Sequence, residues 1–293
     1  MQAYSGLKKT TGGDIFIIAL MVILIILCIL PVLNVAATAF SSPGAVQRQA
    51  VAFLPVEFQY ESIMTVLSDG RFMRSLVWTA VLTVIVVLVN LTMTVLCAYP
   101  LTYMSLKGRK IISFFIVFTM LFSAGLIPAF VLFRDLGLLN HPLVLILPGM
   151  ISVFNMVIIR NFFLGIPDSL RESAEMDGAG PLTILLKIYL PLSTPVLATV
   201  GLFYGVGRWN GFQDALFFMT AAPDWHPIQL LLYNILQNIV GVDPLDPGAT
   251  TPPGWGPTIE AAAIVVATVP ILCVYPFLQK YFVQGATLGA VKG

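Results

Sequence analysis

The sequence has 293 residues, of which 58% are apolar and only 10% are charged. Soluble domains usually carry about 25% charged residues. This composition, with a mean hydropathy of +0.93, therefore excludes an ordinary soluble domain and indicates a polytopic membrane protein. The net charge of +1 says nothing about partners by itself, so the positions of the charges matter more than their sum.

Apolar stretches recur along the chain, and each is long enough to cross about 30 Å of hydrocarbon as a helix. They cover residues 15–37, 75–99, 111–133, 143–164, 192–218 and 258–282. We therefore predict an all-α polytopic membrane protein with six transmembrane helices. Pro148, Gly149, Pro191 and Pro195 interrupt the fourth and fifth stretches, which should loosen helix hydrogen bonding near their ends.

The basic residues predict the orientation of these helices, because cytoplasmic loops carry an excess of Lys and Arg. With a cytoplasmic N-terminus, the inner segments hold Lys8, Lys9, Lys107, Arg109, Lys110, Arg160, Arg171, Lys187, Lys280 and Lys292, whereas the outer loops hold Arg48, Arg71, Arg74 and Arg134. This bias predicts that both termini are cytoplasmic. The first helix is too long for a signal-peptide core and lacks a clear cleavage pattern, so we expect a retained anchor.

The predicted topology divides the chain into a cytoplasmic N-terminus, a six-helix transmembrane domain and a cytoplasmic tail. These parts cover residues 1–14, 15–283 and 284–293, with a cytoplasmic loop at 165–191 and outer loops at 41–74 and 219–257. The second outer loop is rich in Pro, Gly and Asp and too polar to span a membrane. A loop of this length either contacts a partner, covers a cavity or simply connects two helices.

The usual catalytic and metal-binding patterns are missing from the sequence. Cys28, Cys97 and Cys273 lie in apolar runs without a CxxC pair, and His141 and His226 have no ligands at metal-binding spacing. No GxxxxGK[ST] loop is present to hold ATP phosphates. We therefore expect that the chain binds no cofactor or metal itself. Its energy source would be another chain or an ion gradient.

The most informative segment is a polar stretch at residues 172–191, between two apolar runs. Four acidic residues lie within ten positions at its start, which is costly in a bilayer and reasonable on its aqueous surface. They are Asp168, Glu172, Glu175 and Asp177. A soluble partner is therefore expected to meet the membrane protein here.

Local signals predict a helix, a turn and a second helix within this segment. Ser169 and Glu172 have the spacing of a capping box, which predicts a helix start at about Leu170. Gly178 is suited to a left-handed helix end, and Pro181 to the first position of the next helix. A first helix of about seven residues is unstable alone, so it needs a surface on which to dock.

The segment also resembles a known family motif. Glu172-Ser173-Ala174, Asp177-Gly178-Ala179 and Ile188-Tyr189-Leu190-Pro191, with nine residues between Gly178 and Ile188, resemble the EAA loop of binding-protein-dependent ABC importers. Arg208-Trp209-Asn210 and the C-terminal residues 281–293 resemble the carbohydrate-uptake branch, in particular the smaller permease of maltose-type and alginate-type importers. Ser173 departs from the motif, which has alanine there.

This resemblance covers nearly the whole chain and implies a type I ABC importer permease fold. It also implies that the EAA loop is a coupling helix that docks in a cleft of a cytoplasmic ATPase. The residues implied in ATPase coupling are Glu172, Ser173, Ala174, Asp177, Gly178 and Ala179, with Gly289, Ala290, Val291, Lys292 and Gly293 of the tail. The implied partners are a homologous second permease, an ATPase dimer that binds ATP and Mg, and an extracytoplasmic solute-binding protein. The implied location is the bacterial cytoplasmic (inner) membrane.

Arg208 is the main candidate for a substrate contact, because an arginine inside an apolar run must face a partner or a watery cavity. The candidate substrate path is Tyr204, Arg208, Trp209, Asn210 and Asp214. These aromatic and polar side chains suit a saccharide, and Arg208 could meet the carboxylate of an acidic, alginate-like oligosaccharide. Structural contacts of Arg208 and Asp214 with a sister subunit are an equal alternative.

Three asparagines in the spans are interpreted differently. Asn34, Asn90 and Asn155 are better explained by hydrogen bonds between helices than by substrate binding.

Two other classes of protein stay open at this stage. An ion-gradient-driven secondary transporter should carry acidic or histidine residues within its spans, whereas the deep ionisable residue here is an arginine. A membrane scaffold without a pore would tolerate the same hydropathy, but it would need neither a buried Arg208 nor an intact coupling segment.

Overall fold

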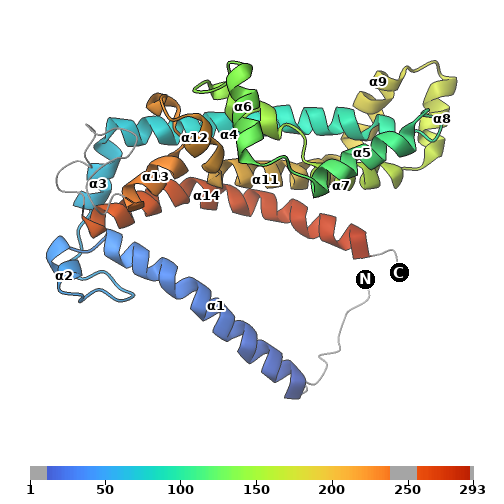
Figure 1. Ribbon diagram of the computed structural model, residues 1–293. Coiled ribbons are helices and arrows are strands. Elements are labelled where there is room, and N and C mark those ends of the chain that lie inside the picture. The colour runs from blue at the N-terminus through green and yellow to red at the C-terminus, as the bar shows by residue number, and fades with distance from the viewer. Residues whose placement is uncertain (1–11, 238–255, 291–293) are drawn as a thin grey trace. The chain divides into compact units, whose positions relative to one another are not determined.

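The computed structural model describes residues 12–237 and 256–290 (Figure 1). Every regular element within those residues is a helix, which confirms the all-α prediction. The chain separates into two compact units, which are described one at a time. The first comprises the described parts of Met1–Asp69 and Thr251–Val266, and the second those of Gly70–Thr250 and Ala267–Gly293.

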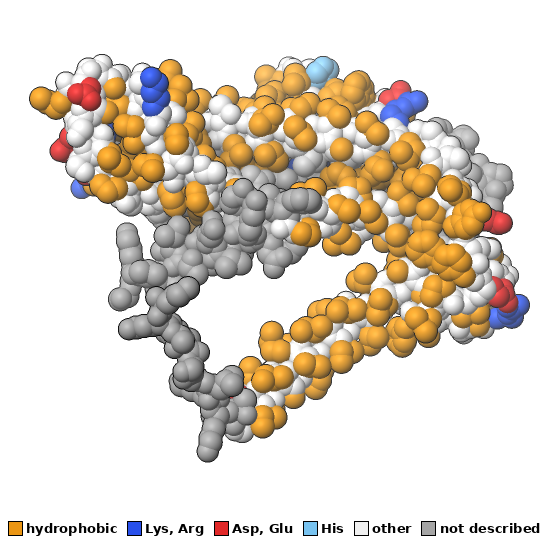
Figure 2. Space-filling view, turned by 180° about the vertical axis from the view of Figure 1, so that it is seen from behind, with side chains coloured by type: hydrophobic (Ala, Val, Ile, Leu, Met, Phe, Trp, Pro, Cys, Tyr) orange, Lys and Arg blue, Asp and Glu red, His pale blue; other side chains and the backbone are white. Residues whose placement is uncertain are grey.

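The first unit contains α1 (Gly12–Ala39), α2 (Pro43–Gln47), α3 (Glu61–Ser68) and the start of α14 (Pro257–Ala290). The apolar side chains of α1 remain exposed along most of its length (Figure 2). Because α1 has 28 residues and a hydropathy of 3.5 over its best window, it is long and apolar enough to cross a membrane. In the last two turns of α1, Asn34 Nδ2 donates to the carbonyl of Ala52 at 2.6 Å.

The second unit is built around α4 (Gly70–Ala98), α7 (Val153–Leu164) and α11 (Thr194–Asn210), which pack against one another. Glycine allows α11 to approach α4 closely: a Cβ added at Gly201 would lie 3.3 Å from Leu91 Cδ1. Asn90 of α4 donates from Nδ2 to the carbonyl of Gly149 at 2.9 Å, as expected for a contact between helical segments.

The remaining helices of the second unit are short. They are η1 (Pro100–Thr102), α5 (Arg109–Leu121), α6 (Leu126–Asp135), η2 (Pro142–Leu145), η3 (Leu147–Gly149), α8 (Asp168–Met176), α9 (Pro181–Ile184), η4 (Leu185–Tyr189), α10 (Leu190–Leu192), α12 (Gln213–Phe218), η5 (Pro223–Trp225) and α13 (Ile228–Gln237). The η elements are 3₁₀ turns except η4, which is one turn of π-helix.

The third, fourth and fifth predicted spans each contain a break; those in the fourth and fifth lie near the predicted interruptions, whereas the break in the third was not predicted. Between α5 and α6 the direction changes by 113°, next to Gly125 with its φ of 89°. The fourth span starts as 3₁₀ turns through Pro148 and bends by 48° before α7. The fifth bends by 83° near Ser193.

The fifth span also ends earlier than predicted. α11 stops at Asn210, and α12 follows as a separate helix. Within the described residues, three helices are long and apolar enough to cross a membrane, or up to six if each bent pair forms one span. A topology of six spans with both termini inside stays a prediction.

The predicted outer loop 219–257 begins with more structure than its composition indicated. α13 is an apolar helix of ten residues, with Ile228 and Leu230 fully buried. The Ile228 amide donates to Thr79 Oγ1 of α4 at 2.7 Å, which fixes the start of α13 to the core. Part of this loop is therefore helical, while residues 238–255 lie outside the described part of the chain.

Candidate functional site

The first helix of the polar segment, α8, begins two residues earlier than predicted. It starts at Asp168 after Pro167, and no side chain caps it, so the predicted capping box of Ser169 and Glu172 was wrong. An ion pair takes its place: Arg171 Nη2 lies 3.1 Å from Asp168 Oδ1. The negative charge of Asp168 in the first turn also suits the positive end of the helix dipole.

The turn after α8 has the predicted geometry. Gly178 has a φ of 79°, in the left-handed region that glycine adopts without strain. The amide of Gly178 donates to the carbonyl of Glu175 at 3.0 Å, and that of Ala179 to the carbonyl of Ala174 at 2.9 Å. These two bonds satisfy carbonyls at the end of α8, and Pro181 then opens α9 as predicted.

The return path runs through α9, η4 and α10 to the start of α11. The π-helical turn of η4 contains Tyr189, which is buried in the main core of the second unit together with Ile184 and Leu185. π-helical turns are rare and are frequent at functional sites. The expected second helix is therefore present, with a local irregularity that the sequence did not predict.

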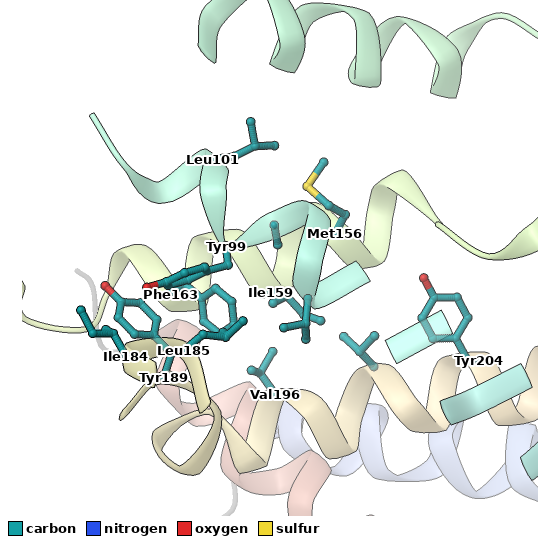
Figure 3. Packing of buried hydrophobic residues seen from close by; sticks show 13 residues of the cluster. Tyr99, Leu101, Met156, Ile159, Phe163, Ile184, Leu185, Tyr189, Val196 and Tyr204 are labelled. Carbon is teal, nitrogen blue, oxygen red and sulfur yellow. The ribbon is translucent and has the colours of Figure 1, made fainter. Parts of the chain in front are cut away.

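An aromatic cluster connects this segment to the core (Figure 3). It consists of Tyr99, Tyr103, Phe163 and Tyr189, and the Tyr99 ring makes edge contacts with the other three at centroid distances of 5.4, 6.3 and 5.1 Å, respectively. The Tyr99 hydroxyl donates to the carbonyl of Pro181 at 3.0 Å. Three elements, the end of α4, α7 and the α9–η4 segment, thus meet at one point.

Arg171 joins α8 to the same cluster. Its guanidinium lies over the Tyr103 ring, 5.0 Å from the centroid, and Nε lies 3.7 Å from Glu175 Oε1. This contact supplies the docking surface that so short a helix needs. Sequence reasoning missed the aromatic cluster, although Tyr99 and Tyr103 four residues apart after the second span were a usable signal.

The predicted coupling residues divide into two groups. Glu172, Ser173, Asp177 and Gly178 are exposed. Ala174 and Ala179 instead pack against the core of this chain. The close approach allowed by Ala174 therefore serves, at least in part, the docking of α8 on its own membrane domain.

The same region contains an exposed apolar residue that sequence reasoning missed. Met176 is 88% exposed at the end of α8, between Glu172 and the Gly178 turn.

At the other predicted contact, the C-terminal tail, Gly289 and Ala290 end α14, whereas Val291, Lys292 and Gly293 lie outside the described residues.

A polar cavity of about 300 Å³ lies where α4, α7 and α11 meet the loops that flank them. Its polar lining consists of Asn90, Ser152, Asn155, Tyr204, Arg208 and Asp214. Two buried atoms in this lining set have no hydrogen-bond partner: Asn90 Oδ1 and Arg208 Nε. The structure thus brings three of the five predicted substrate-path residues together, and adds the two asparagines that were interpreted as helix contacts.

Arg208 lies in the last turn of α11, not deep within a longer helix as predicted. It is only 7% exposed. Nη1 donates to the carbonyl of Leu145 and Nη2 to that of Gly211, both at 3.0 Å. Asp214 Oδ2 lies 3.6 Å from Nη1, on a side chain that is 58% exposed. Arg208 therefore ties the end of α11 to the end of η2, with a carboxylate close to its charge.

Tyr204 is also occupied by structural bonds. Its hydroxyl lies 2.7 Å from Thr94 Oγ1 and accepts from the amide of Ser152 at 3.0 Å. The structure does not place Trp209 and Asn210 on the cavity. Trp209 Nε1 donates to the carbonyl of Ala267 at 3.3 Å, and Asn210 Nδ2 to that of Val206 at 3.0 Å.

No group of three or more His, Cys, Asp or Glu side chains in the described ranges could hold a metal ion. The histidine most enclosed by the fold, His226, is bonded through Nε2 to the carbonyl of Met219 at 2.7 Å. The chemistry of both candidate regions is therefore that of hydrogen bonds, ion pairs and apolar contact.

Comparison with known proteins identifies the family. Residues 90–287, which include both candidate regions, match the family described as "Binding-protein-dependent transport system inner membrane component". This chain is a member of that family. It is accordingly a multi-pass transport subunit of the cytoplasmic membrane, not a catalytic subunit.

Individual relatives agree with this assignment. The Bacillus subtilis polygalacturonan/rhamnogalacturonan transport system permease protein YtcP is 41% identical, over 96% of this chain and 98% of the relative. Protein LplC of the same organism is 40% identical over 90% of both chains. A chain of the crystal structure of a bacterial ABC transporter involved in the import of the acidic polysaccharide alginate matches with a TM-score of 0.85. It is 34% identical, over 94% of this chain and 99% of that one, so the fold is that of a type I ABC importer permease.

Proposed function

We propose that this chain is the transmembrane subunit of an ATP-driven importer of oligosaccharides, including acidic ones. The substrate class is supported by the relatives, one named for polygalacturonan and rhamnogalacturonan and one from an alginate importer. The complete importer would contain a second, homologous permease, an ATPase dimer that binds ATP and Mg, and an extracytoplasmic solute-binding protein. Both termini and the polar segment of this chain would face the cytoplasm.

The observation that carries this proposal is the exposed face of α8 next to the left-handed turn at Gly178. Glu172 and Asp177 present carboxylates that make no ion pair within the described residues, and Met176 presents an apolar side chain between them. Charged residues around an apolar centre are a usual pattern of protein interfaces. We infer that this face docks in a cleft of the ATPase, with Met176 as its apolar centre.

Movement of α8 would reach the membrane helices through the aromatic cluster. Arg171 links α8 to Tyr103, and Tyr99 links the start of α9 to the end of α4. Closure of the ATPase dimer would thus displace α8 together with α4 and α7, and open the pore outward. Hydrolysis would reverse this movement, which gives alternating access without any bond chemistry on this chain.

The polar cavity would form part of the substrate path. Sugars offer hydroxyl groups that both donate and accept, and the cavity offers carboxylate, amide and guanidinium groups beside the Phe203 ring. Arg208 is the candidate partner for a uronate carboxylate, although Asp214 and two carbonyls already occupy part of its guanidinium. Tyr204 would then shape the cavity, because its hydroxyl is already bonded.

Copurification tests the ATPase assignment. Tagged wild-type chain should retain a P-loop ATPase, and the double variant Glu172→Lys with Gly178→Pro should lose it. Asp135→Lys changes another exposed carboxylate at the end of α6 and should retain the ATPase. ATPase retention by the double variant would contradict docking through this face, and uptake that follows an ion gradient and not ATP would overturn the proposal in favour of a secondary transporter.

The substrate needs its own measurement. The reconstituted importer should show ATPase stimulation by solute-binding proteins loaded with oligosaccharides from a panel of uronates and neutral sugars. If Arg208 meets a substrate carboxylate, Arg208→Lys should reduce uronate uptake more than neutral-sugar uptake. Equal losses for both classes would contradict the carboxylate contact while leaving the importer assignment intact.

A further inference from the structure

A second hollow lies beside the coupling segment and is unrelated to the polar cavity. It has a volume of about 650 Å³, and its lining includes Leu96, Tyr99, Tyr103, Lys107, Leu182 and Leu185. These residues come from the end of α4, the residues after η1, and the α9–η4 segment. We call it the interfacial pocket.

Most of the lining of this pocket is apolar and remains open in the chain. Leu96 is 46% and Leu182 62% exposed, although each contributes to the hollow. Covering leucine side chains gains about 25 cal/mol per Å² of apolar surface removed from water. An occupant with a hydrocarbon portion is therefore favoured over a polar solute.

The lining of the interfacial pocket carries positive charge only. Lys107 is the charged residue of its lining, no acidic side chain contributes to it, and Lys107 makes no ion pair in the described part of the chain. Arg109 and Lys110 follow at once in the first turn of α5, which contains no acidic residue. Cations are unfavourable at the positive end of a helix dipole, so an anion bound near this turn would be stabilised by both the cations and the dipole.

Tyrosine and lysine at the end of a membrane helix are typical of the boundary between hydrocarbon and water. Tyr99 and Tyr103 border the pocket on the side where α4 ends, and Lys107 follows four residues later. Basic pockets at this depth on the cytoplasmic side suit anionic lipid headgroups. The combination of apolar wall, tyrosine border and unpaired lysine is the pattern of such a site.

We propose that the interfacial pocket binds one anionic phospholipid of the cytoplasmic leaflet. Its phosphate would contact Lys107, and an acyl chain would lie along Leu96 and Leu182. The proposal rests on the proposed function in one respect, since the proposed topology places α8 and this pocket on the cytoplasmic side. It is otherwise independent of which sugar is transported and of how the ATPase docks.

A lipid at this site would act on coupling, because the pocket shares residues with the machinery described above. Tyr99 and Leu185 belong both to its lining and to the buried core that receives the coupling segment (Figure 3). The occupant would thereby brace the α9–η4 segment against the end of α4. Anionic lipid should therefore raise transport per ATP hydrolysed, and not only stabilise the protein.

The test uses the complete importer in nanodiscs of phosphatidylcholine, alone or with added phosphatidylglycerol. A photoactivatable phosphatidylglycerol should crosslink to peptides containing residues 96–107 or 181–185, mapped by mass spectrometry. Lys107→Gln should reduce this crosslinking about fivefold, the effect of about one lysine at an anionic surface. Leu182→Gln should reduce it as well. Lys187→Gln, an exposed cation of η4 that does not line the pocket, is the matched control and should retain most of it.

Several outcomes would overturn the proposal. Crosslinking of Lys107→Gln at the wild-type level, or equal capture of a photoactivatable phosphatidylcholine, would exclude an anionic lipid site. Crosslinks from position 107 to the ATPase or to the second permease would assign the pocket to a protein partner. Sugar uptake by the wild-type importer in each lipid mixture separates these failures from a failure of the proposed function, which would abolish ATP-dependent uptake in both mixtures.

Discussion

The coupling segment and the polar cavity are each organised by one arginine, but in different ways. Arg171 lies on α8 with 18% of its side chain exposed, paired with the exposed carboxylates of Asp168 and Glu175 and stacked on Tyr103. Arg208 is buried at the end of α11, where its main partners are the carbonyls of Leu145 and Gly211. One arginine therefore holds a helix against a surface, whereas the other replaces missing backbone hydrogen bonds at a helix break.

This difference predicts that substitutions at the two arginines affect different properties of the protein. Exposed ion pairs are weak and screened by salt, because water already solvates both charges. Bonds from a buried guanidinium to carbonyls are stronger, and losing them strands polar groups away from water. Substitutions at Arg208 should therefore act mainly on stability, and substitutions around Arg171 mainly on coupling.

The largest loss of stability is expected for Arg208→Met, because the carbonyls of Leu145 and Gly211 lose a charged hydrogen-bond donor. Each such bond contributes about 1.5–3 kcal/mol, so we expect a loss of about 3 kcal/mol in the free energy of unfolding. Thermal unfolding of the purified complex in detergent measures it. Asp214→Asn should cost less than about 1 kcal/mol because that side chain is mostly exposed. Equal losses in the two variants would show that the ion pair, not the carbonyl bonds, matters.

Gly178→Val should have the second-largest effect, and it changes only the turn after α8 in the coupling segment. A non-glycine residue in the left-handed region costs about 1–2 kcal/mol, and a β-branched side chain is the least tolerated there. Transport should fall about tenfold while the amount of chain in the membrane stays unchanged. Gly178→Asn should recover part of the activity, and Gly180→Ala, at an ordinary φ with open space around it, should behave as wild type.

A smaller effect is expected for Arg171→Leu, which removes the contact with Tyr103 and the ion pairs with the exposed carboxylates of Asp168 and Glu175. Together these contribute about 1–1.5 kcal/mol to the docking of α8. Amide hydrogen exchange of α8 should accelerate accordingly in the variant. In the wild type this exchange should also accelerate with added salt, whereas a salt effect of the same size in Arg171→Leu would contradict the role of its ion pairs.

Tyr99→Phe should have the smallest effect on stability, since the ring stays and only the hydrogen bonds of the hydroxyl to the Pro181 carbonyl and to the Tyr103 hydroxyl are lost. The expected cost is about 0.5–1.5 kcal/mol. More ATP should be hydrolysed per sugar transported, because the start of α9 is less firmly tied to α4. Tyr60→Phe, at an exposed position of the first unit, should leave this ratio unchanged. An unchanged ratio in Tyr99→Phe would remove Tyr99 from the coupling path.

Hydropathy and short motifs predicted the membrane class, the turn at Gly178 and the helix start at Pro181, because these depend on local chemistry. They did not predict that Ser169 and Glu172 would leave α8 uncapped, since Arg171 supplies a competing ion pair to Asp168. The placement of Trp209 away from Arg208 was equally inaccessible. Neighbouring residues on a helix point in different directions, and only packing decides which direction faces the cavity.

The break in the third predicted span also could not be predicted from the composition of its apolar run. An apolar run that includes Gly125 is compatible with a straight helix by composition, and the 113° bend follows from backbone geometry that hydropathy does not report. The aromatic cluster also joins residues far apart in the sequence, such as Tyr99 and Phe163, so the local spacing of Tyr99 and Tyr103 could have indicated only part of it.

The break between α5 and α6 has a consequence for how this protein enters the bilayer. α5 has 13 residues and α6 has 10, so the two are about 20 and 15 Å long, and neither alone spans the hydrocarbon. Neither helix contains a fully buried residue. Exposed backbone at the break is not tolerated against lipid and must be shielded by protein. Residues 109–135 therefore cannot complete their insertion as an independent unit during synthesis, and their final placement awaits later segments of the chain or the neighbouring subunit.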